Sequence, residues 1–336
     1  MKKTVLLACA LVAGAACAEF KAGFARIEAT PPLGIPLVGY FSHRVADGVL
    51  DPLYIDCVAV SDGTNNALIY CVDDLHLTNP FMEKAFPAIT AATDVPRDRI
   101  YVHATHIHTG PSDWKRGGFS EEENRLVMSF ADTRVAKMAE VAKMALADLA
   151  PAKIGVARTV CRNISFIRRY RMKDGSVRTN PGITNPNVKE PLGTPDETLQ
   201  LVRFRRTGAP DIAIVNFGVH PDTVSGTKYS ADWPGVVRNT FEAAVGDAVG
   251  EVPDERDAER RGGFDAGEPG LELRESRPRS EGESQCDCFF HFLDDLSLTV
   301  RTLFYTFFRL SSNPSSWYTI CASVIERKLK YAAKQR

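Results

Sequence analysis

Three strongly apolar segments of the sequence each run directly into a short group of polar side chains. The segments and the groups that follow them are ALIYCV (67–72) with Asp73 and Asp74, RIYVHAT (99–105) with His106 and His108, and DIAIVNFGV (211–219) with His220. Short apolar runs of this kind are typical of buried strands. Because sites often form where polar groups at strand ends converge in a cleft, the pattern predicts a sheet with a candidate site at one edge.

The remaining sequence up to about residue 250 mixes predicted strands with predicted helices. Strands are predicted at 53–60, 67–72, 100–105, 153–160, 164–167, 199–205 and 211–219, with helices at 80–92, 121–149 and 235–246 and a loop at 174–196. The longest helix begins with a capping box, Ser120 and Glu123. Since strands and helices do not alternate strictly, we expect the α/β class (α+β being the alternative), with a mixed β-sheet core and flanking helices.

The first eighteen residues, MKKTVLLACALVAGAACA, have the composition of a secretory signal. We therefore expect cleavage after Ala18 and a periplasmic or secreted protein. Export permits a disulfide between Cys57 and Cys71 on adjacent strands, whereas small buried thiols are the alternative. The formal net charge of −1 gives no electrostatic reason to expect a nucleic-acid partner.

The sequence changes character beyond residue 250. Residues 251–285 contain eleven acidic residues and six arginines but no lysine, a composition typical of disorder. The apolar stretch 289–310 that follows is interrupted by Asp294, Asp295 and Arg301, charges that disfavour a membrane span. We expect one domain over 19–250 and a disordered or unrelated tail over 251–336.

The histidines at 103–108 are not equivalent. His106 and His108 are two residues apart, so in extended backbone both imidazoles would face the same side. His103 is an odd number of residues from His106, and we expect it to be structural. Imidazole is a common zinc ligand, so His106 and His108, taken with His220 at a second strand end, predict a zinc site. The sequence contains neither an H-E-x-x-H helix nor a G-x-S-x-G motif.

Four blocks of the sequence resemble the neutral (alkaline, non-lysosomal) ceramidase superfamily. They are FKAGFARIEATPPLGIPLVGYF (20–41), ATHIHTGP (104–111), ISFIRRYRMKDGSVRTNPG (164–182) and VNFGVHPDTVSG with YSADWPG (215–235). They stand in the order of the family, and the resemblance covers about residues 20–247. It implies a ceramidase-like fold and zinc-assisted hydrolysis of an N-acyl amide in a lipid or small molecule, with membrane contact only through a lipid substrate.

The resemblance also implies roles for individual residues. His106 and His220 match the zinc ligands, and His108 matches a histidine that acts on the substrate beside the metal. Arg168 matches the active-site arginine, with Arg169 as the competing alignment. A solvated basic strand edge is the alternative interpretation of both arginines.

Aspartates in two segments of the sequence are implied to support the zinc ligands. Asp232 would orient one of the zinc-binding side chains without contacting the metal itself. Asp73, like its neighbour Asp74, could do the same, although a turn or helix cap is an equal alternative for this pair.

One departure from the family follows TFEAAVGD (240–247). The family continues there with a small-residue block and an active-site serine, and later with a glutamate and a tyrosine that complete the zinc site. None of these is recognisable here, so we expect a frame change near 246–251 and an incomplete catalytic domain. The rival hypotheses are a non-catalytic secreted binding protein and a zinc hydrolase of another amide or ester.

Overall fold

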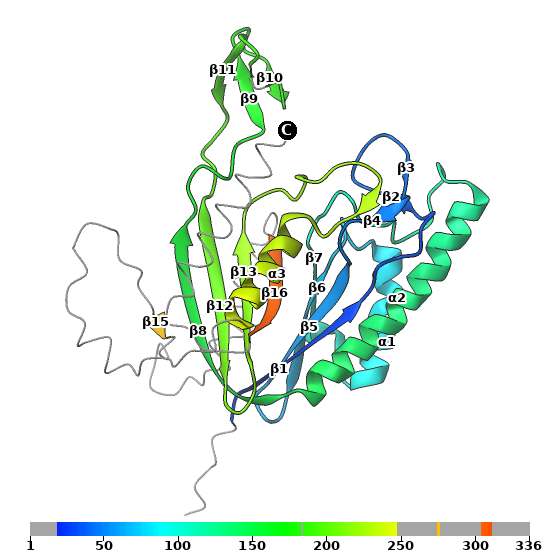
Figure 1. Ribbon diagram of the computed structural model, residues 1–336, viewed down its shortest axis with the longest axis vertical. Coiled ribbons are helices and arrows are strands. Elements are labelled where there is room, and N and C mark those ends of the chain that lie inside the picture. Colours follow the sequence, from blue (N-terminus) through cyan, green and yellow to red (C-terminus); the bar gives the residue numbers. More distant parts are fainter. Residues whose placement is uncertain (1–18, 183, 247–273, 276–303, 311–336) are drawn as a thin grey trace, which may run out of the picture.

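The computed structural model describes residues 19–182, 184–246, 274–275 and 304–310. Its centre is a large sheet with the strand order β16-β13-β12-β8-β1-β5-β6-β7, and β15 also pairs with β8 (Figure 1). The strands are β1 (Lys21–Glu28), β5 (Tyr54–Ser61), β6 (Asn66–Val72), β7 (Ile100–Ala104), β8 (Ala150–Val160), β12 (Thr198–Arg206), β13 (Asp211–Phe217), β15 (Arg274–Glu275) and β16 (Phe304–Leu310). Together with the three α-helices of the described residues, this mostly antiparallel sheet confirms the expected mixed α/β class.

The only parallel pairing in this sheet, among the described strands, joins β6 to β7. The connection between them contains α1 (Asn79–Thr93), as parallel neighbours require a crossover. Parallel strands end at the same edge, so the polar groups after β6 and β7 meet there. The sequence-based expectation for these two strand ends is therefore met by the topology.

The two halves of the sheet pack against each other through one apolar cluster. Strands β1, β5 and β6 contribute Phe24, Val58 and Ile69, which pack with Phe204 of β12 and Ile212 of β13. Along the sheet, β13 is separated from β6 by four strands. Packing between the halves, and not strand adjacency, therefore brings the end of β13 towards the ends of β6 and β7.

Helices α1 and α2 (Glu121–Ala147) cover the other face of β1, β5 and β6 (Figure 1). At Ser120 the predicted capping box of α2 is formed with Glu123. Gly23 allows β1 to approach the end of this helix, because a Cβ at that position would lie 2.1 Å from the Ala145 carbonyl oxygen. The third helix, α3 (Asp232–Gly246), packs Trp233, Val237 and Phe241 against β12 and β13.

A small three-stranded sheet projects as an arm from the main body (Figure 1). It consists of β9 (Arg169–Met172), β10 (Val177–Thr179) and β11 (Val188–Pro191), so the expectation of a plain loop at 174–196 is wrong. The strand expected at 164–167 is also wrong. There, Ile164 packs against the β12–β13 cluster and the Ser165 hydroxyl donates to the Gly218 carbonyl, so the segment is anchored by single side chains without a ladder.

Short strands complete the fold: β2 (Pro36–Leu37) pairs with β3 (Arg44–Val45), and β4 (Gly48–Val49) pairs with β14 (Lys228–Tyr229).

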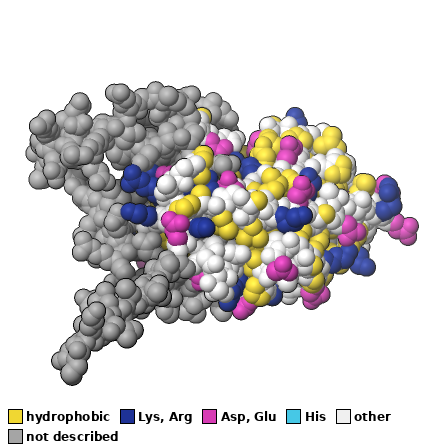
Figure 2. Space-filling view, turned by 90° about the horizontal axis from the view of Figure 1, so that it is seen from below, with side chains coloured by type: hydrophobic (Ala, Val, Ile, Leu, Met, Phe, Trp, Pro, Cys, Tyr) yellow, Lys and Arg dark blue, Asp and Glu magenta, His cyan; other side chains and the backbone are white. Residues whose placement is uncertain are grey.

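Cys57 and Cys71 do not form a disulfide, because they belong to the clusters on opposite faces of the sheet. On the face in Figure 2, basic and acidic side chains are interspersed. Within the described ranges, no helix is both long and apolar enough to cross a bilayer.

The predicted signal at 1–18 lies outside the described residues. So does most of the segment 251–336, of which only β15 and β16 are described, as strands that pair with β8 and β13. The domain boundaries and the expected frame change therefore stay predictions.

Candidate functional site

The loop after β7 carries His106 and His108 in an irregular backbone. His106 has a φ of 66°, so the expectation of two imidazoles on extended backbone is wrong. The N–H groups of His106 and Ile107 both donate to the Asp74 carbonyl, at 2.7 and 3.2 Å. Left-handed backbone is uncommon for residues other than glycine. At His106 it is held by these hydrogen bonds to Asp74, which lies just after β6.

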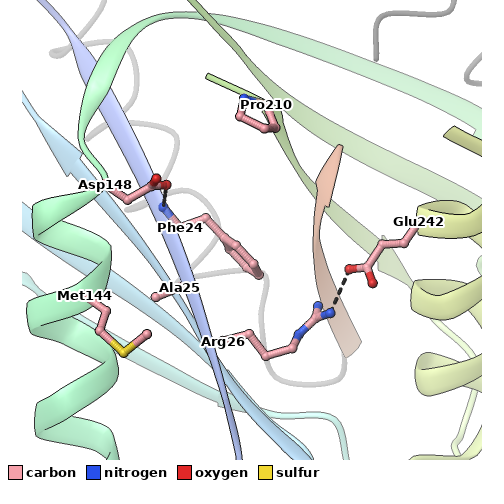
Figure 3. A pocket seen from close by; sticks show the side chains of 7 residues that line it. All are labelled: Phe24, Ala25, Arg26, Met144, Asp148, Pro210 and Glu242. Carbon is pink, nitrogen blue, oxygen red and sulfur yellow. Dashed lines mark hydrogen bonds and ion pairs between the residues drawn. The ribbon is translucent and has the colours of Figure 1, made fainter. Parts of the chain in front are cut away.

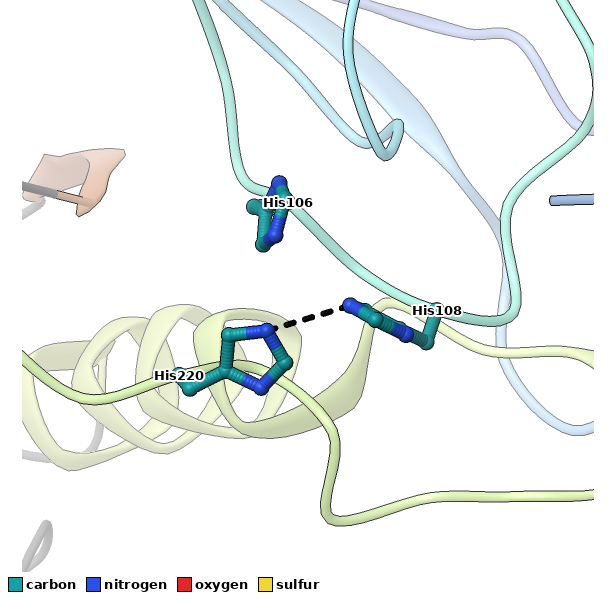
Figure 4. Close-up of side chains that lie close together, drawn as sticks. All are labelled: His106, His108 and His220. Atoms are coloured by element: carbon teal, nitrogen blue, oxygen red, sulfur yellow. Dashed lines mark hydrogen bonds between the residues drawn. The ribbon is translucent and has the colours of Figure 1, made fainter. Parts of the chain in front are cut away.

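The structure nevertheless brings His106, His108 and His220 together (Figure 4). One ring nitrogen of each lies within 4.8 Å of the others, and the Nε2 atoms of His108 and His220 are 3.1 Å apart. The His106 Nδ1–H donates to the Leu75 carbonyl at 2.8 Å. That bond places the proton on Nδ1, so Nε2 carries the lone pair that a metal ion would use, the arrangement usual for metal-bound histidines.

His108 has different surroundings from His106. Its Nδ1 is buried and has no hydrogen-bond partner among the described residues. A Cβ at Gly39 would lie 2.7 Å from this nitrogen, and Gly39 has a φ of +106°, so glycine is required beside the ring. Tyr40 packs its ring edge-on to His108 at 5.3 Å, and Arg44 donates to the His108 carbonyl at 2.7 Å. The β2–β3 segment thus forms the wall behind this imidazole.

The electrostatic environment favours neutral imidazoles in the cluster. Desolvation lowers the pKa of His106 and of His108, and it lowers the pKa of His220, with help from Arg168, to about 4. The Asp222 carboxylate opposes this shift in all three pKa values. Near neutral pH the three rings therefore keep the lone pairs that a metal ion needs.

Arg168 lies directly before β9, at the base of the arm. Its carbonyl accepts the N–H of Asn180, the residue after β10, at 2.8 Å. Its charge contributes to the lowered pKa of each clustered histidine. Arg169 is the first residue of β9, and its carbonyl accepts the Leu192 N–H inside the arm. Of the two arginines, Arg168 is therefore the one whose charge acts on the histidine cluster.

The predicted aspartates do not contact the histidine rings through the hydrogen bonds described. Asp232 accepts from the N–H groups of Thr223 and Val224 at 2.9 and 2.8 Å and from the Thr223 hydroxyl. It thereby shapes the loop that carries His220. Asp73 accepts from the Tyr54 N–H at 3.0 Å and from Arg238 at 2.9 Å.

His103 lies in β7, opposite Cys71 of β6, and outside the cluster. Desolvation in the strand lowers its pKa to about 4.

Sequence reasoning assigned no role to Tyr40 or Asp222, whose side chains share a hydrogen bond beside the cluster. Asp222 could have been noticed, because it stands two residues after His220. Tyr40 stands in the first of the four family-like blocks (20–41), but the resemblance assigned no role to this residue.

A separate pocket lies between β1, the end of α2 and α3 (Figure 3). Its lining is Phe24, Ala25, Arg26, Met144, Asp148, Pro210 and Glu242. Arg26 forms ion pairs with Glu242 and with Asp56, so the charges are satisfied within the fold. The pocket shares no residue with the histidine cluster, which carries the candidate chemistry.

Comparisons with known proteins indicate a ceramidase-like fold. No model of a protein family matches the chain, and no curated protein matches it. The fold is similar to the neutral ceramidase from Pseudomonas aeruginosa, with a TM-score of 0.53, 16% identity and coverage of 69% of this chain and 37% of that chain. A ceramidase complexed with C2 gives a TM-score of 0.51, 16% identity and coverage of 68% and 36%. The chain thus spans little more than a third of the solved chains it matches.

Proposed function

We propose that the chain carries part of the active site of an exported zinc-dependent hydrolase of N-acyl amide bonds. A lipid amide of the ceramide type is the substrate class we infer, with small N-acyl amides as the wider group. The observation that carries the proposal is the convergence of His106, His108 and His220 on a fold similar to solved ceramidases.

The residues present fit a zinc ion. His106 and His220 would hold it, because neutral imidazoles are its usual nitrogen ligands, and His106 already directs its Nδ1–H to the Leu75 carbonyl. His108 lacks such a partner at Nδ1, so we assign it to the substrate and not to the metal. Catalytic zinc sites use about three protein ligands, so the pair requires a further ligand.

When bound, zinc would polarise the amide carbonyl and lower the pKa of a water molecule. His108 would exchange a proton through Nε2, the nitrogen that faces His220 across 3.1 Å. Arg168 would stabilise the negative charge that develops on the carbonyl oxygen, a contribution that is often large in acyl transfer. Tyr40 and Asp222 close one side of the cluster through their mutual hydrogen bond.

The first experiment measures zinc content and hydrolysis of N-acyl-sphingosine by the purified protein. We expect one zinc per chain in wild type and its loss in His106→Ala and His220→Ala. His103→Ala, in the same strand–loop segment, is the matched control and should keep its zinc. His108→Gln should keep zinc while kcat falls by roughly 10²- to 10⁴-fold, as for loss of a general acid–base.

Two results would contradict the proposal. Zinc well below one per chain and unchanged in His106→Ala would favour a non-catalytic binding protein. Turnover restricted to esters or to short N-acyl amino acids would retain a zinc hydrolase but remove the ceramide-type substrate.

A further inference from the structure

Two adjacent aspartates at the end of β6 each pair with a buried arginine from a different helix. Asp74 accepts from Arg134 of α2 at 2.5 Å, and Asp73 accepts from Arg238 of α3 at 2.9 Å. All four side chains are no more than 2% exposed. Because a buried charge that loses its partner is strongly unfavourable, both pairs fix the end of β6 against the helices.

Only the Asp74 pair leads directly to a histidine of the cluster. The Asp74 carbonyl accepts the His106 N–H at 2.7 Å, and the next carbonyl, of Leu75, accepts the His106 Nδ1–H at 2.8 Å. The Asp74 carboxylate also accepts the Leu75 N–H at 2.7 Å. The two-residue segment Asp74–Leu75 therefore sets both the backbone turn and the ring orientation of His106.

Asp73 makes different contacts. Besides Arg238, its carboxylate accepts from the Tyr54 N–H at 3.0 Å and from the Thr105 hydroxyl at 3.4 Å. These bonds tie β6 to β5 and to the end of β7, and none of them involves an imidazole. The two ion pairs are thus equally buried, but only the Asp74 pair is linked to an imidazole by hydrogen bonds.

Arg134 is itself held in a defined place. Its guanidinium lies over the rings of Phe81 and Phe130, at 4.9 and 5.6 Å from their centroids. If this charge were removed, the buried Asp74 carboxylate would lose its partner, and it would take up a proton or turn towards another donor. The carbonyls of Asp74 and Leu75 would move with it, and His106 would lose the bonds that keep its φ at 66°.

We propose that Arg134 is a positioning residue that acts through Asp74 to hold His106 in the orientation a metal ligand needs. The inference rests on the proposed function for the identity of the site. It adds a buried residue of α2, 28 positions along the chain from the histidine it serves. Arg238, paired with Asp73, has no such role.

The experiment compares Arg134→Met with Arg238→Met in the full chain. Each variant removes the cation of one buried pair, so both should lose similar stability in chemical denaturation. The first readout is the hydrogen-bonded Nδ1–H signal of His106 in proton–nitrogen NMR of histidine-labelled protein, assigned with His106→Gln. We expect it to disappear or exchange rapidly in Arg134→Met and to remain in Arg238→Met.

The second readout is zinc affinity, measured by competition with a chromogenic chelator. Loss of an outer partner of a metal-bound histidine typically weakens binding about 10- to 100-fold, and we expect this in Arg134→Met alone. Equal effects of the two variants on both readouts would overturn the inference, as would an unchanged His106 signal in Arg134→Met. If a methionine variant does not fold, Arg134→Lys and Arg238→Lys provide the same comparison, because lysine keeps the charge but not the planar fork.

The two proposals fail in different ways. Absence of zinc binding in wild type would count against the proposed function, whereas the His106 NMR signal still decides the role of Arg134. Normal zinc binding with identical behaviour of both variants would leave the function intact and remove the positioning role.

Discussion

His106 and Asp232 both have left-handed backbone conformations. His106 belongs to the histidine cluster, and Asp232 binds the loop that carries His220. Their φ angles are 66° and 50°, and among the described residues the other non-glycine positions with positive φ are Asp94, Asn163 and Asn180. Asp, Asn and His tolerate this region better than other residues, but it still costs free energy, which surrounding contacts must offset. At His106 the Asp74 carbonyl does so, and at Asp232 the Ser230 hydroxyl accepts the N–H at 3.1 Å. Backbone strain here coincides with the candidate site.

His103 makes a pH-dependent contribution to stability. Its pKa is lowered to about 4 in the folded state, whereas an unfolded histidine titrates near 6.5. Between these values the unfolded chain binds more protons, so stability rises with pH across this window and falls as the pH drops from 6.5 towards 4. We expect wild type to lose about 2 kcal/mol more than His103→Gln between pH 7.5 and pH 5. Urea denaturation at both pH values measures this, and identical losses would contradict it.

At this scale the sequence predicts the chemistry better than the contacts. The spacing of His106 and His108 and the position of His220 at another strand end were enough to select the three clustered histidines. The contacts behind His106 were not predictable, because the Asp74 carbonyl that binds it and the Arg134 side chain that pairs with Asp74 lie 32 and 28 residues from it in the sequence. A hydrogen bond to a backbone carbonyl leaves no trace in residue identity.

Helix α2 is the element whose sequence signals are strongest. The Ser120 hydroxyl accepts the Glu123 N–H at 3.2 Å, and the Glu123 carboxylate accepts the Ser120 N–H at 2.7 Å. Loss of such a cap costs about 1 kcal/mol. We expect Ser120→Ala to lower the free energy of unfolding by that amount, while Ser129→Ala, exposed within the same helix, should change it by less than about 0.5 kcal/mol. Denaturant titration distinguishes them, and equal effects would rule out a capping contribution.

Elements with regular apolar patterns were predictable, and elements with other constraints were not. The periodicity of apolar residues predicted helices α1, α2 and α3. Apolar runs predicted the central strands β5, β6, β12 and β13. Strand β1 was not predicted, because its sequence contains Gly23, a residue unfavourable in strands, which is needed for contact with α2. The arm strands were missed because they are short and mostly exposed, so no apolar alternation marks them.

The whole molecule depends on how the two halves of its sheet are joined. Strands β1 and β8 pair at only two positions, Lys21 with Pro151 and Ala22 with Ala150. Sequence indicates apolar strands but not the curvature that brings β13 over β6, since that arises from packing across the shared cluster. The histidine cluster therefore needs both halves: His106 and His108 follow one, and His220 follows the other.

Arg206 is one of the polar connections between these halves. Its guanidinium donates to the carbonyl oxygens of Ala22 and Asp148, at 3.3 and 2.9 Å, and to the Asp148 carboxylate at 2.6 Å. The side chain is fully buried, so Arg206→Met leaves several buried acceptors without a donor. We expect it to lower the free energy of unfolding by about 3 to 5 kcal/mol. Arg203→Met, which breaks an ion pair within one half, should cost less.

Native-state hydrogen exchange tests whether this loss is shared by the two halves. Amides of β5 and β6 report on one half, and amides of β12 and β13 report on the other. Because the shared apolar cluster makes the halves unfold together, Arg206→Met should reduce protection by the same free energy in both sets. Reduced protection confined to β12 and β13 would show that the halves open independently. In that case His220 could separate from His106 without global unfolding, and zinc affinity would fall with the local opening and not with overall stability.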